Sequence, residues 1–227
     1  MYNESGVIAK TAKTLSDYMD AHFSDYEILF ADDGSTDGCG DRVRELHLPH
    51  VKVVGGLPNR GKGHAVRLAM TAADGDIRIF TDADLAYGTD VISRIVSTFE
   101  QTGADMVIGS RTLDKDGYAG YTTMRRVASK LYLRILASVG GFALSDSQCG
   151  CKAYSGAAAK AIFDRCTVDG FAFDFETILW ANKLGYRIAE MPVRVLCHGE
   201  SKIHMVSDSL RMLMDLYHIK KRIRAEK

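Results

Sequence analysis

The eight-residue stretch IRIFTDAD, residues 77–84, decides the fold expected for this chain. Its first four residues are mainly apolar and predict a short strand, which is followed closely by Asp82 and Asp84. Sheets built from alternating strands and helices bind ligands outside the carboxyl ends of their strands. The two carboxylates therefore stand where a ligand site is expected. Two other Asp-x-Asp triplets lack this position, because residues 74–76 precede the strand and residues 114–116 lie in a polar loop.

Strand and helix patterns alternate on both sides of this stretch. Short apolar runs predict strands at residues 27–31, 51–54, 77–80, 106–108 and 188–196. Apolar residues at three- and four-residue steps predict helices at residues 7–19, 62–73, 91–99, 122–139, 157–163 and 175–184, and a long helix from residue 205. This order indicates an α/β fold with a mostly parallel sheet flanked by helices. We expect one domain over residues 1–204, followed by a C-terminal amphipathic helix over residues 205–227.

The composition excludes several classes of protein. Apolar residues make up 46% of the 227 residues, which is enough for a sizeable core. Lys and Arg together number 29, as do Asp and Glu, so the basic excess of a nucleic-acid-binding protein is absent. The five scattered cysteines predict a reducing compartment and no disulfide framework. We see no signal peptide and no apolar run of about 18 residues, so we expect a soluble or peripheral protein.

Asp82 and Asp84 form the first candidate site. Two carboxylates one residue apart in extended chain point the same way and can hold one Mg²⁺ or Mn²⁺, while a diphosphate fills the remaining positions. The alternative is a solvated turn in which an aspartate caps the next helix.

Two further motifs follow the first and second predicted strands. The turn at Asp32, Asp33 and Gly34 could accept hydrogen bonds from a base or ribose, with Gly34 letting a ligand approach the backbone; the alternative is a surface turn. The Gly-x-x-x-x-Gly-Lys pattern over residues 56–62 imitates a phosphate-binding loop, but the next residue is Gly and not Ser or Thr. This disfavours a nucleotide triphosphatase and favours Arg60 and Lys62 as donors to a diphosphate at a helix N-terminus. A plain loop before a helix remains the alternative.

Seven motifs in one order resemble the inverting family 2 glycosyltransferases with the GT-A fold of nucleotide-diphospho-sugar transferases. The resemblance runs from Tyr2 to about Tyr217 and is strongest to the polyprenyl-phosphate branch, in particular to dolichyl-phosphate glucosyltransferases. The motifs are NE at residues 3–4, DDGSTDG at 32–38, NRGKG at 59–63, DAD at 82–84, GSR at 109–111, DSQCGCK at 146–152 and GFAFDFE at 170–176.

The resemblance implies a role for each matching residue. The catalytic group would be Asp84, Arg111 and Asp174, and the metal ligands would be Asp82 and Asp84, holding Mg²⁺ or Mn²⁺. The donor, a nucleotide sugar, would be bound by Asn3, Glu4, Asp32, Asp33, Gly34, Ser35, Arg60, Lys62 and Asp82. The acceptor phosphate and its pocket would involve Arg125, Ser129, Gln148, Glu176 and Lys202. Several of these residues have ordinary alternatives, as surface charges or as structural groups.

A phosphate acceptor suits the basic second half of the chain. A phosphate monoester is mostly dianionic at neutral pH, because its second pKa is about 6, so positive charge must position it and no general base is needed. Residues 122–139 and 205–224 combine an apolar stripe with basic residues, as helices on an anionic bilayer do. We therefore expect a membrane surface and a polyprenyl phosphate lipid as partners, on the cytoplasmic face of a membrane. The alternative is that both helices pack on the core.

Two departures from the family pattern bear on the donor and the fold. The family's first strand precedes the Asn-Glu pair and is missing here, which would expose apolar surface and remove one wall of the nucleotide pocket. Ala86 stands where mannosyl-transferring relatives tend to carry Gln, which favours UDP-glucose. The alternatives are a mannose or N-acetylhexosamine donor, or a non-catalytic relative that binds a nucleotide sugar or a lipid phosphate.

Overall fold

The computed structural model describes residues 1–118, 121–196 and 205–226, with the backbone alone for Arg125 and residues 205–211. Its strands are β1 (Ile28–Asp32), β2 (Val51–Gly55), β3 (Ile77–Thr81), β4 (Met106–Ser110), β5 (Cys151–Ser155) and β6 (Ile188–Pro192). Its helices are α1 (Ile8–His22), α2 (Cys39–Glu45), α3 (Lys62–Ala72), α4 (Asp90–Thr102), α5 (Thr123–Gly140), α6 (Gly156–Phe163), α7 (Phe173–Lys183) and α8 (Met205–Ala225).

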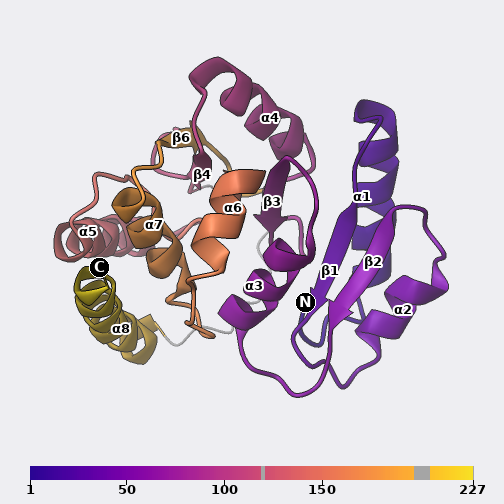
Figure 1. The fold of residues 1–227 in the computed structure, drawn as a ribbon, viewed down its shortest axis with the longest axis horizontal. Coiled ribbons are helices and arrows are strands. Elements are labelled where there is room, and N and C mark those ends of the chain that lie inside the picture. The colour runs from indigo at the N-terminus through magenta and orange to yellow at the C-terminus, as the bar shows by residue number, and fades with distance from the viewer. Residues whose placement is uncertain (119–120, 197–204, 227) are drawn as a thin grey trace.

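The strands form two sheets (Figure 1). One is the parallel pair β1–β2, and the other has the order β3-β5-β4-β6. Within the larger sheet β4 and β6 are parallel, and β5 runs antiparallel to both β3 and β4. Strands β3, β4 and β6 therefore share one direction, and their carboxyl ends lie at the same edge of the sheet.

Most predicted elements are present within a few residues of their expected bounds, but two were not predicted. Helix α2 has the polar sequence CGDRVRE and buries only Val43 among its larger side chains, so it carries little apolar periodicity. Strand β5, with the sequence CKAYS, contains a lysine that is completely buried, which interrupts the apolar run that a central strand usually shows. The last strand is also shorter than expected and ends at Pro192.

The first turn of the chain lies beside the end of β1. The Met1 ammonium donates to the Ala31 carbonyl at 2.6 Å, and the Asp33 amide donates to the Met1 carbonyl at 3.0 Å. Among the described residues no strand ladder joins β1 to β3, so the smaller sheet is held to the rest by helix packing. Helix α1 supplies much of it, because Leu15 and Met19 contact the apolar clusters of both sheets.

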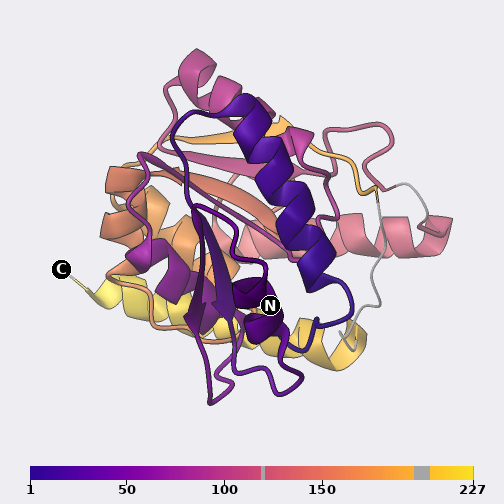
Figure 2. The same ribbon diagram turned by 90° about the vertical axis from the view of Figure 1, so that its right-hand side faces the viewer.

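The two helices expected at a membrane lie alongside each other at one edge of the molecule, far from β1 and β2 (Figures 1 and 2). In α8, the side chains of Leu216, Ile219 and Ile223 are buried in the same core cluster as α7. This part of α8 therefore packs on the core, which is the alternative that the sequence left open.

Helix α5 is different, because its apolar stripe faces outward. The side chains of Met124, Val127, Leu131 and Ile135 are 82%, 61%, 56% and 42% exposed. The opposite face, with Leu133 and Leu136, is buried. The helix thus has two apolar faces, and only one contacts the protein. None of the described helices combines the length and apolar character that a bilayer crossing requires.

Candidate active site

Lys62 and Asp82 meet where strand β3 ends. Asp82 directly follows β3, and Lys62 is the first residue of α3. The Lys62 Nζ donates to Asp82 Oδ1 at 2.5 Å. Two motifs that are twenty residues apart in sequence are thus brought into direct contact. The contact places the cation expected for a diphosphate beside a carboxylate expected for a metal.

Charge accumulates around this pair. Burial alone would lower the pKa of Lys62, but the carboxylates of Asp82, Asp174 and Asp84 outweigh it and raise the pKa. Partial desolvation raises the pKa of Asp84, and the negative charge of Asp82 adds to the rise. Burial also raises the pKa of Asp174, against the opposing effect of Lys152 and Lys62. The five acidic and basic groups at this edge of the sheet therefore act on one another as a single cluster.

The floor of this cluster is built from strand β5 and helix α7. The Lys152 side chain is completely buried, pairs with Asp174 and donates to the Cys149 carbonyl at 2.8 Å. A buried lysine without such partners would be strongly destabilising. Gly150 lies directly under Asp82, since a Cβ at this position would come within 2.1 Å of Asp82 Oδ2. The position of the Asp82 carboxylate therefore depends on the absence of a side chain at Gly150.

The expected nucleoside residues are joined by hydrogen bonds within the protein. The Asn3 amide donates to Ser35 Oγ at 3.1 Å, and the Ser35 amide donates to Asp32 Oδ1 at 2.9 Å. Asp33 is buried and holds the loop that leads to Lys62, as described below. The closest atoms to a Cβ at Gly34 belong to Pro58 and Asn59, the nearest at 2.4 Å. The sequence predicted that a ligand approaches the backbone at Gly34. In the structure, the loop that contains Pro58 and Asn59 makes this close approach. The Glu4 carbonyl accepts the amides of Val7 and of Ile8, the first residue of α1.

Arg111 and Asp146 form a second pair beside the first cluster. Arg111 Nε and Nη2 donate to the two Asp146 oxygens at 2.7 and 2.9 Å, and the Asp146 side chain is completely buried. The Arg111 guanidinium lies 5.7 Å from the centre of the Tyr118 ring. From α5, Lys130 Nζ lies 5.7 Å and the Arg126 guanidinium 6.0 Å from the same ring. Three cations therefore gather around Tyr118.

These two cations of α5 lack an acidic counterpart in the part of the chain that the structure describes. No carboxylate among those residues lies within ion-pair distance of Arg126 or Lys130. Cations that are close together and unpaired form a favourable place for an anion. This basic group lies next to the exposed apolar stripe of α5.

The remaining residues expected at the acceptor are distributed differently. Ser129 is half-buried on α5, and Gln148 is half-buried beside Asp146, with its amide nitrogen 3.4 Å from the Ser147 carbonyl. Glu176 is completely buried, and both its oxygens accept hydrogen bonds from the protein. The Lys202 residue and the Arg125 side chain lie outside the described part of the chain.

Asp82 and Asp84 fit a divalent cation that is shared with another molecule. Among the described residues no group of three or more Asp, Glu, His or Cys side chains is arranged to hold a metal ion. One Asp84 oxygen accepts the Ala86 amide at 3.0 Å. Desolvation raises the pKa of Asp84 and the negative charge of Asp82 adds to the rise, and a bound cation would favour the charged form of both carboxylates. Mg²⁺ is commonly held by one or two carboxylates together with substrate phosphates.

Sequence reasoning assigned no role to three residues that shape the site. These are Gly150, Lys152 and Asp146. A lysine inside an otherwise apolar strand was the available signal, because a buried lysine requires an acidic partner. The sequence around Gly150 does not indicate that a glycine is needed there. The need arises because the Asp82 side chain, from a distant part of the chain, lies against it.

Known proteins resemble this chain in sequence and in fold. The family model described as glycosyl transferase family 2 matches residues 1–163. Glycosyltransferase AglD of Haloferax volcanii is 29% identical over 225 residues, which cover 93% of this chain and 34% of AglD. Dolichyl-phosphate beta-glucosyltransferase of Saccharomyces cerevisiae is 27% identical over 240 residues, covering 96% of this chain and 72% of the yeast protein. The chain thus spans about a third of AglD.

Solved structures support the same fold. Glucosyl-3-phosphoglycerate synthase from Mycobacterium tuberculosis, in complex with Mn²⁺, UDP and glucosyl-3-phosphoglycerate, matches with a TM-score of 0.69 and 19% identity, covering 97% of this chain and 77% of that one. The expected GT-A fold is confirmed. Because the family model covers well over half of the sequence, this chain belongs to glycosyl transferase family 2.

Proposed function

We propose that this protein transfers a sugar, with glucose preferred, from a nucleotide-sugar donor to a polyprenyl phosphate at a membrane surface. The observation that carries the proposal is the contact between Lys62 and Asp82 at the carboxyl end of β3. It joins a cation suited to a diphosphate to a carboxylate suited to a divalent metal. Inversion at the sugar follows from the family resemblance and from direct attack by the acceptor.

The donor half of the proposal rests on this acidic and basic cluster. Mg²⁺ or Mn²⁺ held by Asp82 and Asp84 would neutralise the diphosphate as it leaves the sugar. Lys62 would turn from Asp82 to the diphosphate, a short movement for a half-buried lysine. The complex of the mycobacterial synthase with Mn²⁺ and UDP-glucose supports a metal and a uridine donor by analogy of fold.

The acceptor half rests on the three cations around Tyr118. In this proposal a phosphate dianion binds between Arg111 and Lys130, which has no acidic partner in the described part of the chain, and it needs no base to attack the sugar. Dolichyl-phosphate beta-glucosyltransferases among the relatives support a lipid phosphate as acceptor. A lipid chain on this phosphate would pass next to the exposed apolar stripe of α5.

Membrane contact is therefore proposed for α5 and not for the described core-facing residues of α8. Burying an apolar side chain the size of Leu131 contributes roughly 1.5–3 kcal/mol. Basic residues near an anionic surface add about 1 kcal/mol each. The apolar contribution favours any bilayer surface, and the basic residues favour one with anionic lipids.

Transfer to a short polyprenyl phosphate tests the whole proposal. We would incubate the protein with radiolabelled UDP-glucose, GDP-mannose or UDP-N-acetylglucosamine and with Mg²⁺ or Mn²⁺. Lipid-linked glucose that disappears with EDTA is the expected result, and Asp84→Asn should abolish it while leaving the thermal melt intact. Preferential transfer of mannose or N-acetylglucosamine would correct the donor. UDP binding without any transfer would favour a non-catalytic relative.

Flotation with vesicles tests the membrane part. The double variant Met124→Ser, Leu131→Ser should lose binding to vesicles that contain anionic lipid. Val7→Ser removes a comparably exposed apolar residue from another surface, 46% exposed, and should bind as the unchanged protein does. Equal binding by the unchanged protein, the double variant and Val7→Ser would contradict the proposed contact between α5 and the membrane.

A further inference from the structure

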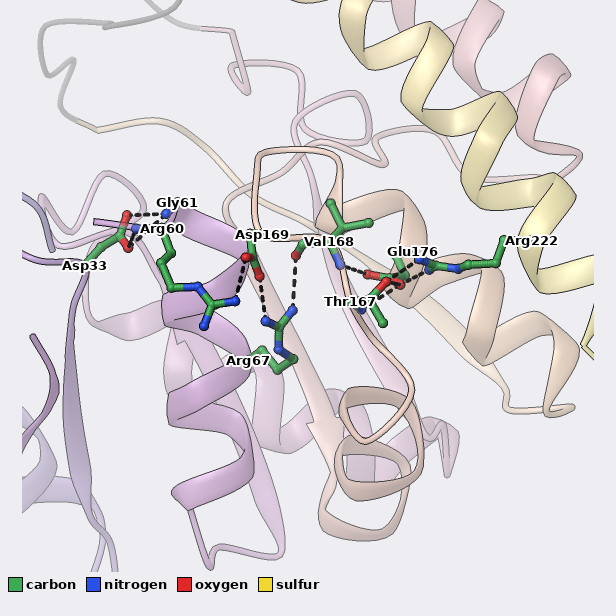
Figure 3. Close-up of polar contacts among 9 residues, drawn as sticks. All are labelled: Asp33, Arg60, Gly61, Arg67, Thr167, Val168, Asp169, Glu176 and Arg222. Atoms are coloured by element: carbon green, nitrogen blue, oxygen red, sulfur yellow. Dashed lines mark hydrogen bonds and ion pairs between the residues drawn. The ribbon is translucent and has the colours of Figure 1, made fainter. Parts of the chain in front are cut away.

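The turn that presents Lys62 is held from two sides, and Figure 3 shows the contacts. On one side, Asp33 accepts the amides of Arg60 and Gly61 at 3.0 Å and the Asn59 side-chain amide at 3.0 Å. Asp33 is buried and follows β1, so it attaches the turn to the smaller sheet. The contacts of Asp33, however, support the start of α3 from only one direction.

The other side of the turn is held by a loop at residues 167–170. Asp169 pairs with Arg60 at 2.9 Å and with Arg67 at 2.6 Å, and its carbonyl accepts the His64 amide at 3.1 Å. The backbones are in direct contact here. A Cβ at Gly61 would come within 2.5 Å of the Asp169 carbonyl oxygen. Any movement of this loop must therefore move the first turn of α3.

This loop is in turn attached to the core by Glu176. The two Glu176 oxygens accept the amides of Thr167 and Val168 at 2.9 and 2.8 Å. The Arg222 guanidinium, from the C-terminal helix α8, pairs with the same carboxylate and with Thr167 Oγ1. Glu176 is completely buried, so Arg222 supplies the charge that balances it.

We propose that Arg222, acting through Glu176 and Asp169, is a positioning residue for the diphosphate-binding turn at Lys62. Helix α8 then has a role beyond packing, because its last turns fix the loop against which the start of α3 rests. Removal of Arg222 leaves the buried Glu176 carboxylate with no cation beside it and only the amides of Thr167 and Val168 and the Thr167 hydroxyl as donors. The loop at Thr167 and Val168 then loses its outer support. The inference rests on the proposed function only for the identity of the ligand at Lys62.

Arg222→Gln is the test, and Arg224→Gln is the matched control. Both change an exposed arginine of the same helix by the same charge, but the structure gives Arg224 no partner among the described residues. Hydrogen exchange of the protein without ligand should show loss of protection at residues 59–64 and 167–170 in Arg222→Gln and not in Arg224→Gln. A merely structural role for Arg222 would loosen α7 and α8 alone.

UDP binding, measured by calorimetry with Mn²⁺, gives the functional consequence. Arg222→Gln should weaken UDP binding by about fivefold or more relative to Arg224→Gln. Arg222→Lys should recover part of the loss, because it keeps the charge and loses the two-pronged contact.

A second pair of variants keeps the test valid if Arg222→Gln folds poorly. Asp169→Asn acts at the other end of the same path, and Asp164→Asn changes an exposed aspartate that pairs only loosely with Lys160, at 3.7 Å. Unchanged protection of residues 59–64 in both test variants, or UDP affinities equal to the controls, would overturn the inference. If the unchanged protein bound no UDP, the proposed donor would be wrong. Hydrogen exchange would then be the only test of the positioning role of Arg222.

Discussion

Replacing Gly150 by Ala should disable the proposed metal site without unfolding the protein. The new Cβ would lie 2.1 Å from Asp82 Oδ2, whereas ordinary contact begins near 3.4 Å, so the carboxylate must retreat by about 1.3 Å. The backbone of Gly150 has no positive φ, so alanine is not strained there. Because the obstructing atom ends a flexible side chain, the cost in stability is small. A misplacement of about 1 Å in a reacting site can cost roughly a hundredfold in rate.

The assay is transfer of glucose to polyprenyl phosphate at increasing Mn²⁺, with the thermal melt measured in parallel. We expect a kcat reduced by about two orders of magnitude, a higher Mn²⁺ requirement and a nearly unchanged melting temperature. Gly6→Ala is the control, since a Cβ at Gly6 would have no atom within 4 Å. Full activity and unchanged Mn²⁺ dependence in Gly150→Ala would refute the role given to the position of Asp82.

Three further predictions concern stability, pH and the acceptor. Lys152→Met leaves the buried Asp174 carboxylate unpaired and should lower the unfolding free energy by about 3–5 kcal/mol in urea titrations; a change below about 1 kcal/mol would contradict the pairing. Backbone amides hold the pKa of Asp37 at about 2, below its ordinary 3.8, so its carboxylate stabilises the fold above about pH 4 and this contribution is lost as the pH falls towards 2. Asp37→Asn should therefore be less stable than the unchanged protein at pH 7, and the difference should disappear below about pH 2, as measured by thermal melts. Lys130→Ala should raise the KM for the lipid phosphate and leave that for the donor unchanged, whereas Arg134→Ala, an exposed change on the same helix, should alter neither.

The fold could be predicted because its main signals are local. The strand at residues 77–81 is apolar and ends at two aspartates, and the helices at residues 90–102 and 123–140 have regular apolar steps. Strand β5 was not predicted because Lys152 can be buried in it only when Asp174 balances its charge, and Asp174 lies 22 residues further on. The sequence also did not predict that the strands form two separate sheets. That separation depends on which strands pair with each other, and the residue pattern of a single strand does not determine its partner.

The sequence predicted which motifs lie near one another better than it predicted the contacts of their residues, and the roles given to these residues stay predictions. Lys62 and Asp82 were each expected at the donor, and the structure brings them together. Asp33 and Glu176 carry the residue types of a binding site, but in the structure their oxygens accept hydrogen bonds from the protein's own loops. A carboxylate that binds a ribose and one that binds a backbone amide look the same in sequence, because the chemistry of the two contacts is the same.

In the proposed function, the contact between Lys62 and Asp82 also explains how the site stays balanced when it is empty. A partly buried carboxylate without a cation is costly, and here Lys62 supplies that cation from within the protein. Asp84 has no ion-pair partner among the residues that the structure describes, and desolvation raises its pKa. A donor that arrives with its metal would release Lys62 to the diphosphate and give both aspartates a cation. Lys62 and Asp82 would then each exchange one partner for another and Asp84 would gain one, so donor and metal should bind more tightly together than separately. UDP titrations with and without Mn²⁺ measure this coupling, and independent binding of the two would refute it.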